Sequence, residues 1–139
     1  MAAKGSEENE FKIVSGEKED TVIILFLGQI RSQEVPELET LMNTLVEKPQ
    51  PSVIFSFRDV TQILPGAHAT IAKLLSSLRK AGKLLALCSI KPEIKISLLQ
   101  AGVVRESEIF NNIPEGWQSL RVRIHDAAAK DAVPEKKAA

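Results

Sequence analysis

The chain has 139 residues, 44% of them hydrophobic, and its 18 basic and 18 acidic residues leave no formal net charge. This length and apolar content suit one domain with a core of ordinary size. A neutral chain has no long-range field to attract nucleic acid or anionic lipid, so the composition disfavours both as partners.

Both ends of the chain are polar and have little to bury. Residues 1–10 are acidic and lack the apolar core of a secretory signal, and residues 129–139 carry almost no large apolar side chain. We therefore expect two disordered tails around one folded domain at residues 11–128. No apolar run approaches the roughly 20 residues that span a bilayer, so we expect a cytoplasmic protein without direct membrane insertion.

The first predicted elements are two strands. Residues 11–14 half alternate between apolar and polar, which is typical of an edge strand, whereas residues 22–27 form a continuous apolar run, which favours an interior strand. Residues 15–20 between them are polar and contain a glycine, so we expect a hairpin connection there.

Helices and strands then alternate. Apolar residues at three- and four-residue steps predict one helix over residues 35–46 and another through residues 71–78, the second with Gly82 at a left-handed cap. The apolar run at residues 52–57 predicts a strand between these helices, and the run at residues 83–90 predicts another strand after the second helix.

The last third continues the pattern. Pro92 opens a short helix that Gly102 closes, residues 109–110 offer a short extra strand, and a last helix is predicted from Pro114, with Trp117 covering the core. Crossover helices return the chain in one direction. We therefore predict an α/β single domain with a mixed four- to five-stranded sheet and about four helices.

Several segments, in this order and spacing, resemble the STAS domain, the family of bacterial anti-sigma factor antagonists and of the cytoplasmic tails of sulphate transporters. The resemblance covers about residues 11–124. Its carriers are Gly28-Gln29-Ile30, Glu37-Leu38-Glu39, Asp59-Val60-Thr61-Gln62-Ile63, Ala81-Gly82-Lys83-Leu84-Leu85-Ala86-Leu87 and the run from Pro92 to Val103.

The resemblance implies a phosphorylation switch at one loop, but this chain has no serine at that position. In phosphorylatable members of the family, the loop after the third strand reads Asp-Ser-Ser-Gly, and its first serine is the kinase target. Those positions hold Leu64, Pro65, Gly66 and Ala67 here. Neither proline nor glycine has a hydroxyl, so we expect no phosphorylation at Pro65. Thr61 is the alternative phosphoacceptor, although turn hydrogen bonding explains it as well.

The same resemblance implies a partner-binding surface around this loop. We also expect Arg58 and Asp59 to end the third strand, where open sheets with parallel strands tend to place binding surfaces. Free N–H groups where the next helix starts could attract an anion or a partner's carboxylate, although a turn that merely starts a helix is the commoner case. The residues assigned to this surface are Arg58, Asp59, Thr61, Leu64, Pro65, Gly66, Ala67, His68 and Thr70.

Catalytic and cofactor signatures do not assemble in this sequence. His68 has no predictable partner, His125 lies far along the chain, and Cys88 sits in an apolar run that is typical of a buried inert thiol. Lys73, Arg79 and Lys80 are expected to form a solvated helix face. We therefore expect no enzyme, no cofactor and no metal.

The leading hypothesis is a noncatalytic cytoplasmic regulatory module that binds an anti-sigma factor or a histidine-kinase-like ATPase. One alternative is an accessory subunit of an ABC lipid transporter that contacts the transporter's ATPase. Another is a small-molecule sensor for a nucleotide or lipid. A homodimer through a sheet edge is also left open.

Overall fold

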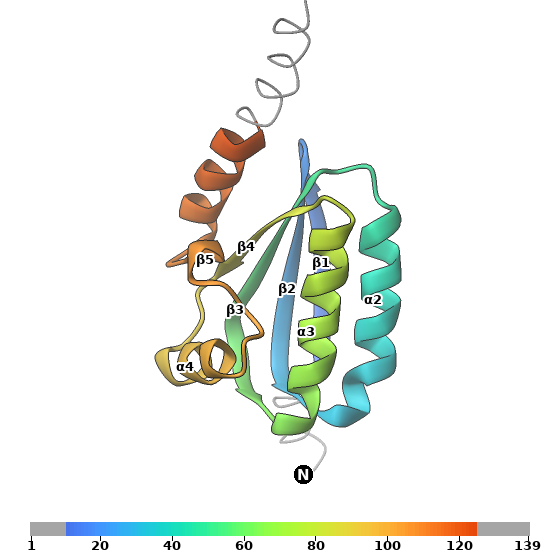
Figure 1. Cartoon of the computed structure of the whole chain (residues 1–139), viewed down its shortest axis with the longest axis vertical. Coiled ribbons are helices and arrows are strands. Elements are labelled where there is room, and N and C mark those ends of the chain that lie inside the picture. The colour runs from blue at the N-terminus through green and yellow to red at the C-terminus, as the bar shows by residue number, and fades with distance from the viewer. Residues whose placement is uncertain (1–10, 125–139) are drawn as a thin grey trace, which may run out of the picture.

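A computed structural model describes residues 11–124, which form a five-stranded mixed sheet with helices packed against it (Figure 1). The strand order is β1-β2-β3-β4-β5; β1 is antiparallel to β2 and the other neighbours are parallel. The strands are β1 (Lys12–Lys18), β2 (Thr21–Ile30), β3 (Ser52–Ile63), β4 (Leu84–Cys88) and β5 (Ile109–Phe110). The predicted α/β class and mixed sheet are confirmed.

Longer and shorter helices connect these strands. The α-helices are α2 (Val35–Glu47), α3 (Pro65–Lys80), α4 (Pro92–Gln100) and a last helix over 113–124, and the 3-10 turns are η1 (Ser32–Glu34) and η2 (Glu106–Glu108). Gly82 has φ +84° and Gly102 has φ +73°, as expected where left-handed caps end α3 and α4. None of the helices in the described part combines the length and apolar character needed to cross a bilayer.

The hairpin is tighter than the sequence predicted. β1 continues to Lys18, which pairs with Thr21, so only Glu19 and Asp20 form the turn. The prediction of a connection over residues 15–20 was wrong because β1 is an edge strand whose last residues are exposed. Polar composition therefore did not distinguish strand from loop here.

The core has two parts, one on each face of the sheet. Figure 1 shows α2 and α3 on the same face of the sheet, and there their apolar sides are buried against β2 and β3. On the other face, the helix over 113–124 packs Leu120 and the partly buried Trp117 against Ile54, Ala86 and Cys88. This confirms that Trp117 covers the core.

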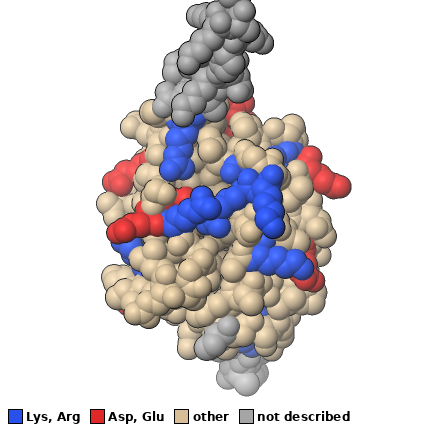
Figure 2. Space-filling model, in the orientation of Figure 1, with Lys and Arg blue, Asp and Glu red and all other residues tan. Residues whose placement is uncertain are grey.

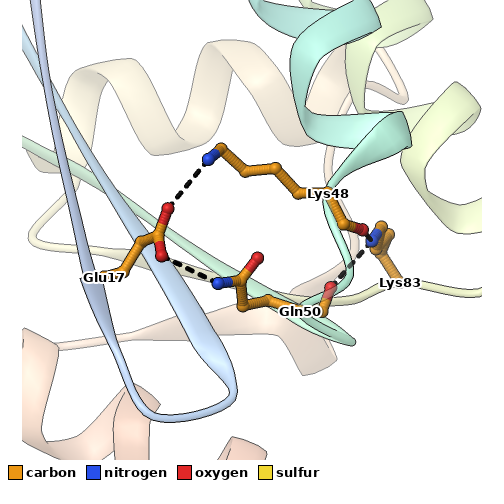
Figure 3. Close-up of polar contacts among 4 residues, drawn as sticks. All are labelled: Glu17, Lys48, Gln50 and Lys83. Atoms are coloured by element: carbon orange, nitrogen blue, oxygen red, sulfur yellow. Dashed lines mark hydrogen bonds and ion pairs between the residues drawn. The ribbon is translucent and has the colours of Figure 1, made fainter.

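Polar contacts tie the elements together where the parallel strands begin (Figure 3). The Glu17 carboxylate accepts hydrogen bonds from Lys48 Nζ at 2.8 Å and Gln50 Nε2 at 2.9 Å. Lys83 Nζ donates to the carbonyls of Lys48 and Gln50, so the α3–β4 connection is held to the α2–β3 connection. The hydrogen bond and charge of Lys48 lower the pKa of Glu17, and desolvation lowers the pKa of Lys83.

Several predictions concern residues outside the described part of the chain. These are the two disordered tails at 1–10 and 129–139, the end of the folded domain at residue 128, and the relation of His125 to His68. The homodimer stays a prediction too.

Candidate partner-binding face

The far half of β3 is irregular, and this irregularity positions the predicted site. While β2 advances from Leu25 to Leu27, β3 advances from Ser56 to Asp59, and a second extra residue follows between Val60 and Gln62. Each extra residue is a β-bulge, which redirects the side chains that follow it.

The bulges give this part of β3 a three-residue repeat. Phe57, Val60 and Ile63 are buried, and the pairs Arg58-Asp59 and Thr61-Gln62 between them are exposed. The sequence-based prediction that Arg58 and Asp59 end the third strand is therefore wrong, because the strand continues to Ile63. Two adjacent exposed side chains at a bulge look like the start of a loop when only the sequence is read.

The next strand does not cover this stretch. β4 pairs with β3 only as far as Ser56, and beyond that point Lys91 Nζ, just before α4, donates a 2.9 Å hydrogen bond to the Val60 carbonyl. On the β2 side, Gln29 Nε2 donates to Gln62 Oε1 at 2.9 Å. β3 is therefore anchored on both sides while its bulged side chains stay accessible.

Helix α3 begins one residue after β3 ends. Leu64 is extended and its N–H donates to the Ile30 carbonyl at 2.9 Å, after which Pro65 starts the first turn. The predicted loop over Leu64–Ala67 is therefore only one residue long. Proline suits this first position because its fixed φ is already helical and it has no N–H to leave unpaired.

The first turn of α3 divides the predicted site residues. Ala67 is fully buried, so its side chain is not available on the surface, whereas Gly66 is exposed. A Cβ on Gly66 would lie 3.0 Å from the Ser32 Cβ of η1, which is a tight contact. Gly66 thus permits close packing against η1, and a bulky side chain there would disturb the fold as well as the surface.

His68 faces α4 across a small cavity. The cavity has a volume of about 180 Å³ and is lined by the end of β3, His68 and the α4 residues Glu93, Ile94 and Ser97. The His68 Nε2 and Ser97 Oγ atoms are 3.4 Å apart. Thr61 and His68 therefore meet at one place, together with Glu93 and Ser97, which sequence reasoning missed although their four-residue spacing puts them on one helix face.

Thr70 lies on another side of α3. It is one turn from Gly66, which packs on η1, and three residues from Lys73, whose Nζ lies 3.6 Å from a Glu39 carboxylate oxygen of α2. Residues at these spacings share a helix face, so Thr70 faces α2 rather than the cavity.

Within the described residues, the polar side chains of this end form neither a hydrogen-bonded catalytic triad nor a metal-ligating cluster. Across residues 11–124, no carboxylate is hydrogen-bonded to His68, so the His68–Ser97 pair lacks the orienting group of a nucleophile and base set. The same residues hold no cluster of three or more metal-ligating side chains. Cys88 is buried, and burial, with the charge of Glu115, raises the pKa of its thiol to about 12, as expected for an unreactive cysteine.

Several proteins of known structure share the fold of this chain. An anti-sigma factor antagonist from Mycobacterium paratuberculosis superposes with a TM-score of 0.70 at 12% identity, covering 81% of this chain and 96% of that one. The phosphorylated form of the Bacillus cell fate determinant SpoIIAA gives 0.61 at 14% identity, covering 81% and 98%. A sulfate transporter family protein from Wolinella succinogenes gives 0.69 at 16% identity, covering 79% and 92%.

No curated protein sequence matches the chain significantly. The family model of the STAS domain matches residues 12–116, which is most of the chain and contains β1 to β5, the bulged end of β3 and the start of α3. The protein belongs to the STAS domain family.

Proposed function

We propose that the protein is a noncatalytic regulatory module of the bacterial cytoplasm that binds a protein partner at the carboxyl end of its sheet. The name carboxyl end is used here for residues 58–63, where β3 ends, together with the first turn of α3 and the facing side of α4; it does not mean the C-terminus of the chain. The partner class is an anti-sigma factor or a histidine-kinase-like ATPase. The observation that carries the proposal is the bulged end of β3, which presents adjacent exposed side chains beside a polar cavity.

This end suits the recognition of a partner because its polar side chains are exposed and make few ion pairs or hydrogen bonds within the described part of the chain. Arg58 and Asp59 take part in no ion pair among the described residues, and Thr61 lies at the cavity without a side-chain hydrogen bond there. Binding surfaces in open parallel sheets tend to lie beyond the carboxyl ends of the strands. The family membership and the antagonist-like fold support a regulatory role in binding a protein partner.

Regulation at this end differs from a serine switch. Pro65 and Gly66 begin α3 and cannot carry phosphate, so partner binding is constitutive or is controlled by the partner. Phosphorylation of Thr61 could still control partner binding, because this hydroxyl is exposed at the cavity. An added phosphate would put about two negative charges beside Glu93. In this proposal, phosphorylation of Thr61 would release the partner.

The test is affinity capture from the native cytoplasm with the wild type, Thr61→Arg and Thr44→Arg. Thr61→Arg adds bulk and charge at the carboxyl end without a buried contact to break. Thr44 is an exposed residue in the second half of α2, so Thr44→Arg makes the same substitution on another surface. Both variants should match the wild type in circular dichroism. Gly66→Arg is a poorer choice because of its contact with Ser32.

The proposal expects an anti-sigma factor or kinase-like ATPase that the wild type and Thr44→Arg retain and Thr61→Arg loses. Loss of an ABC-transporter ATPase instead would assign the same face to the alternative role of a transporter accessory subunit. If all three baits capture the same proteins in equal amounts, the carboxyl end is not the partner-binding face.

A further inference from the structure

A second cavity lies at the opposite end of the sheet, beside the start of β4. It has a volume of about 360 Å³ and is lined by parts of α3, β4, η2 and the last helix. Four of its lining side chains are cationic, Arg79, Lys83, Arg105 and Arg123, and one, Glu108, is a carboxylate. Figure 2 shows Lys and Arg side chains gathered across the middle of the face that is turned toward the viewer. We call this cavity the basic pocket.

Only one of these cations is neutralised by the pocket's carboxylate. Arg79 donates two hydrogen bonds to Glu108 from its guanidinium group, one from Nε to Oε2 at 3.0 Å and one from Nη2 to Oε1 at 2.5 Å. The two side chains are 18% and 8% exposed, so the pair is mostly buried. A bidentate pair of this kind engages both oxygens of the carboxylate. The prediction that Arg79 belongs to a solvated helix face is therefore wrong.

The other three cations have only neutral partners among residues 11–124, or none. Lys83 Nζ is held by backbone carbonyls, and Arg123 donates weakly to the carbonyls of Leu85 at 3.5 Å and Ser107 at 3.2 Å. Arg105 is exposed and has no ion pair in this part of the chain. Like charges around one cavity repel one another, and this repulsion is relieved when an anion enters.

The donors also match one kind of anion. Guanidinium groups recognise phosphate oxygens through paired N–H donors, and an ammonium adds a point charge. Three cations without a carboxylate partner suit a multiply charged group better than a single carboxylate. The pocket's volume lies within the usual range for small-molecule sites, about 300–1,000 Å³.

We propose that the basic pocket binds a small molecule that bears phosphate, with Arg105 and Arg123 contacting the phosphate oxygens. Arg79 and Glu108 form the wall of the pocket, and Lys83 contributes charge from its backbone anchorage. The site lies at the start of β4, whereas the proposed partner-binding face lies beyond the strands' carboxyl ends, so the two proposals stand or fall separately.

The experiment is a calorimetric titration of the full chain at low salt with inorganic pyrophosphate and, separately, ribose 5-phosphate. Arg105→Gln removes an exposed cation that has no internal ion pair, so the fold should be unaffected. Arg58→Gln is the matched control, since it removes an exposed arginine from the carboxyl end. Arg123→Gln provides a second variant in the pocket.

We expect at least one probe to bind the wild type, and Arg105→Gln and Arg123→Gln each to weaken that binding about tenfold, the loss of one charge-assisted contact. Arg58→Gln should bind like the wild type. Tighter binding of ribose 5-phosphate would identify a phosphate ester as the ligand class, and tighter binding of pyrophosphate a free polyphosphate. Absence of binding by both probes, or equal weakening in Arg58→Gln, would overturn the proposal.

Discussion

The two ends of the sheet use polar residues in opposite ways. Where the parallel strands begin, side chains such as Glu17, Lys83 and Glu108 are tied to other elements by short hydrogen bonds. Where β3 ends, Arg58, Asp59 and Thr61 are exposed and have few contacts of their own. We call the first region the amino end.

This difference separates side chains that link elements of the fold from side chains that are available to the proposed protein partner. Contacts at the amino end, such as Glu17 to Lys48 and Arg79 to Glu108, join segments about 30 residues apart in the sequence. The carboxyl end is held by its backbone and by buried residues such as Val60, which leaves its exposed side chains available to the proposed partner. Matched substitutions at the two ends should therefore differ in their effect on stability.

The largest difference is expected for Glu108→Ala against Glu93→Ala. Removing the Glu108 carboxylate leaves Arg79 charged and mostly buried, so we expect a loss of about 2–4 kcal/mol in the free energy of unfolding. Glu93 is exposed at the carboxyl end, and its removal should change this free energy by less than about 0.5 kcal/mol. Urea unfolding at neutral pH measures both, and equal losses would contradict the comparison.

A smaller difference is expected for Thr21→Val against Thr61→Val. The Thr21 hydroxyl is buried and lies 2.7 Å from the Ser52 hydroxyl, so its loss should cost about 1 kcal/mol. The exposed Thr61 should tolerate valine to within about 0.5 kcal/mol. The same unfolding measurement tests both variants. If Thr61→Val were the less stable of the two, the side chains of the carboxyl end would contribute to stability, against the comparison.

The smallest effect concerns pH. The pKa of Glu17 is lowered in the folded protein, chiefly by its hydrogen bond with Lys48, so the folded state favours the ionised form. This stabilisation is present above the ordinary carboxyl pKa and is lost as pH falls through the lowered value. Between neutral pH and about pH 3, the wild type should lose more stability than Glu17→Gln.

Glu93→Gln is the control for this pH dependence, because it removes an exposed carboxylate from the other end. Its unfolding free energy should fall with pH in parallel with that of the wild type. A parallel fall in Glu17→Gln as well would show that the contact with Lys48 does not stabilise the folded protein.

The regular elements were predictable from the sequence because their periodicity reports burial directly. The repeat of Ile71, Leu74 and Leu78 matches the buried face of α3, and Gly82 ends that helix as predicted. The family resemblance was also readable from segment order, and the match over residues 12–116 confirms it.

The carboxyl end was harder to predict because two bulges replace the two-residue repeat of a strand with a three-residue one. The alternation therefore indicated that Arg58 and Asp59 end the strand, although β3 continues to Ile63. The burial of Ala67 was missed for a related reason, since α3 starts at Pro65 and turns that side chain inward.

The basic pocket had no sequence signal at all. Its four cations come from α3, the α3–β4 connection, the segment before η2 and the last helix. A neutral overall composition hides such a local concentration of charge, because folding alone brings the four together.

The central claim is that the partner binds the carboxyl end of the sheet. Amide hydrogen exchange of the wild type, with and without the partner identified by capture, tests it most directly. Our account predicts that slowed exchange on binding concentrates in residues 58–68 and in α4, with little change at residues 17–21 and 48–52. Protection confined to those amino-end residues or to β1, with residues 58–68 unaffected, would contradict it.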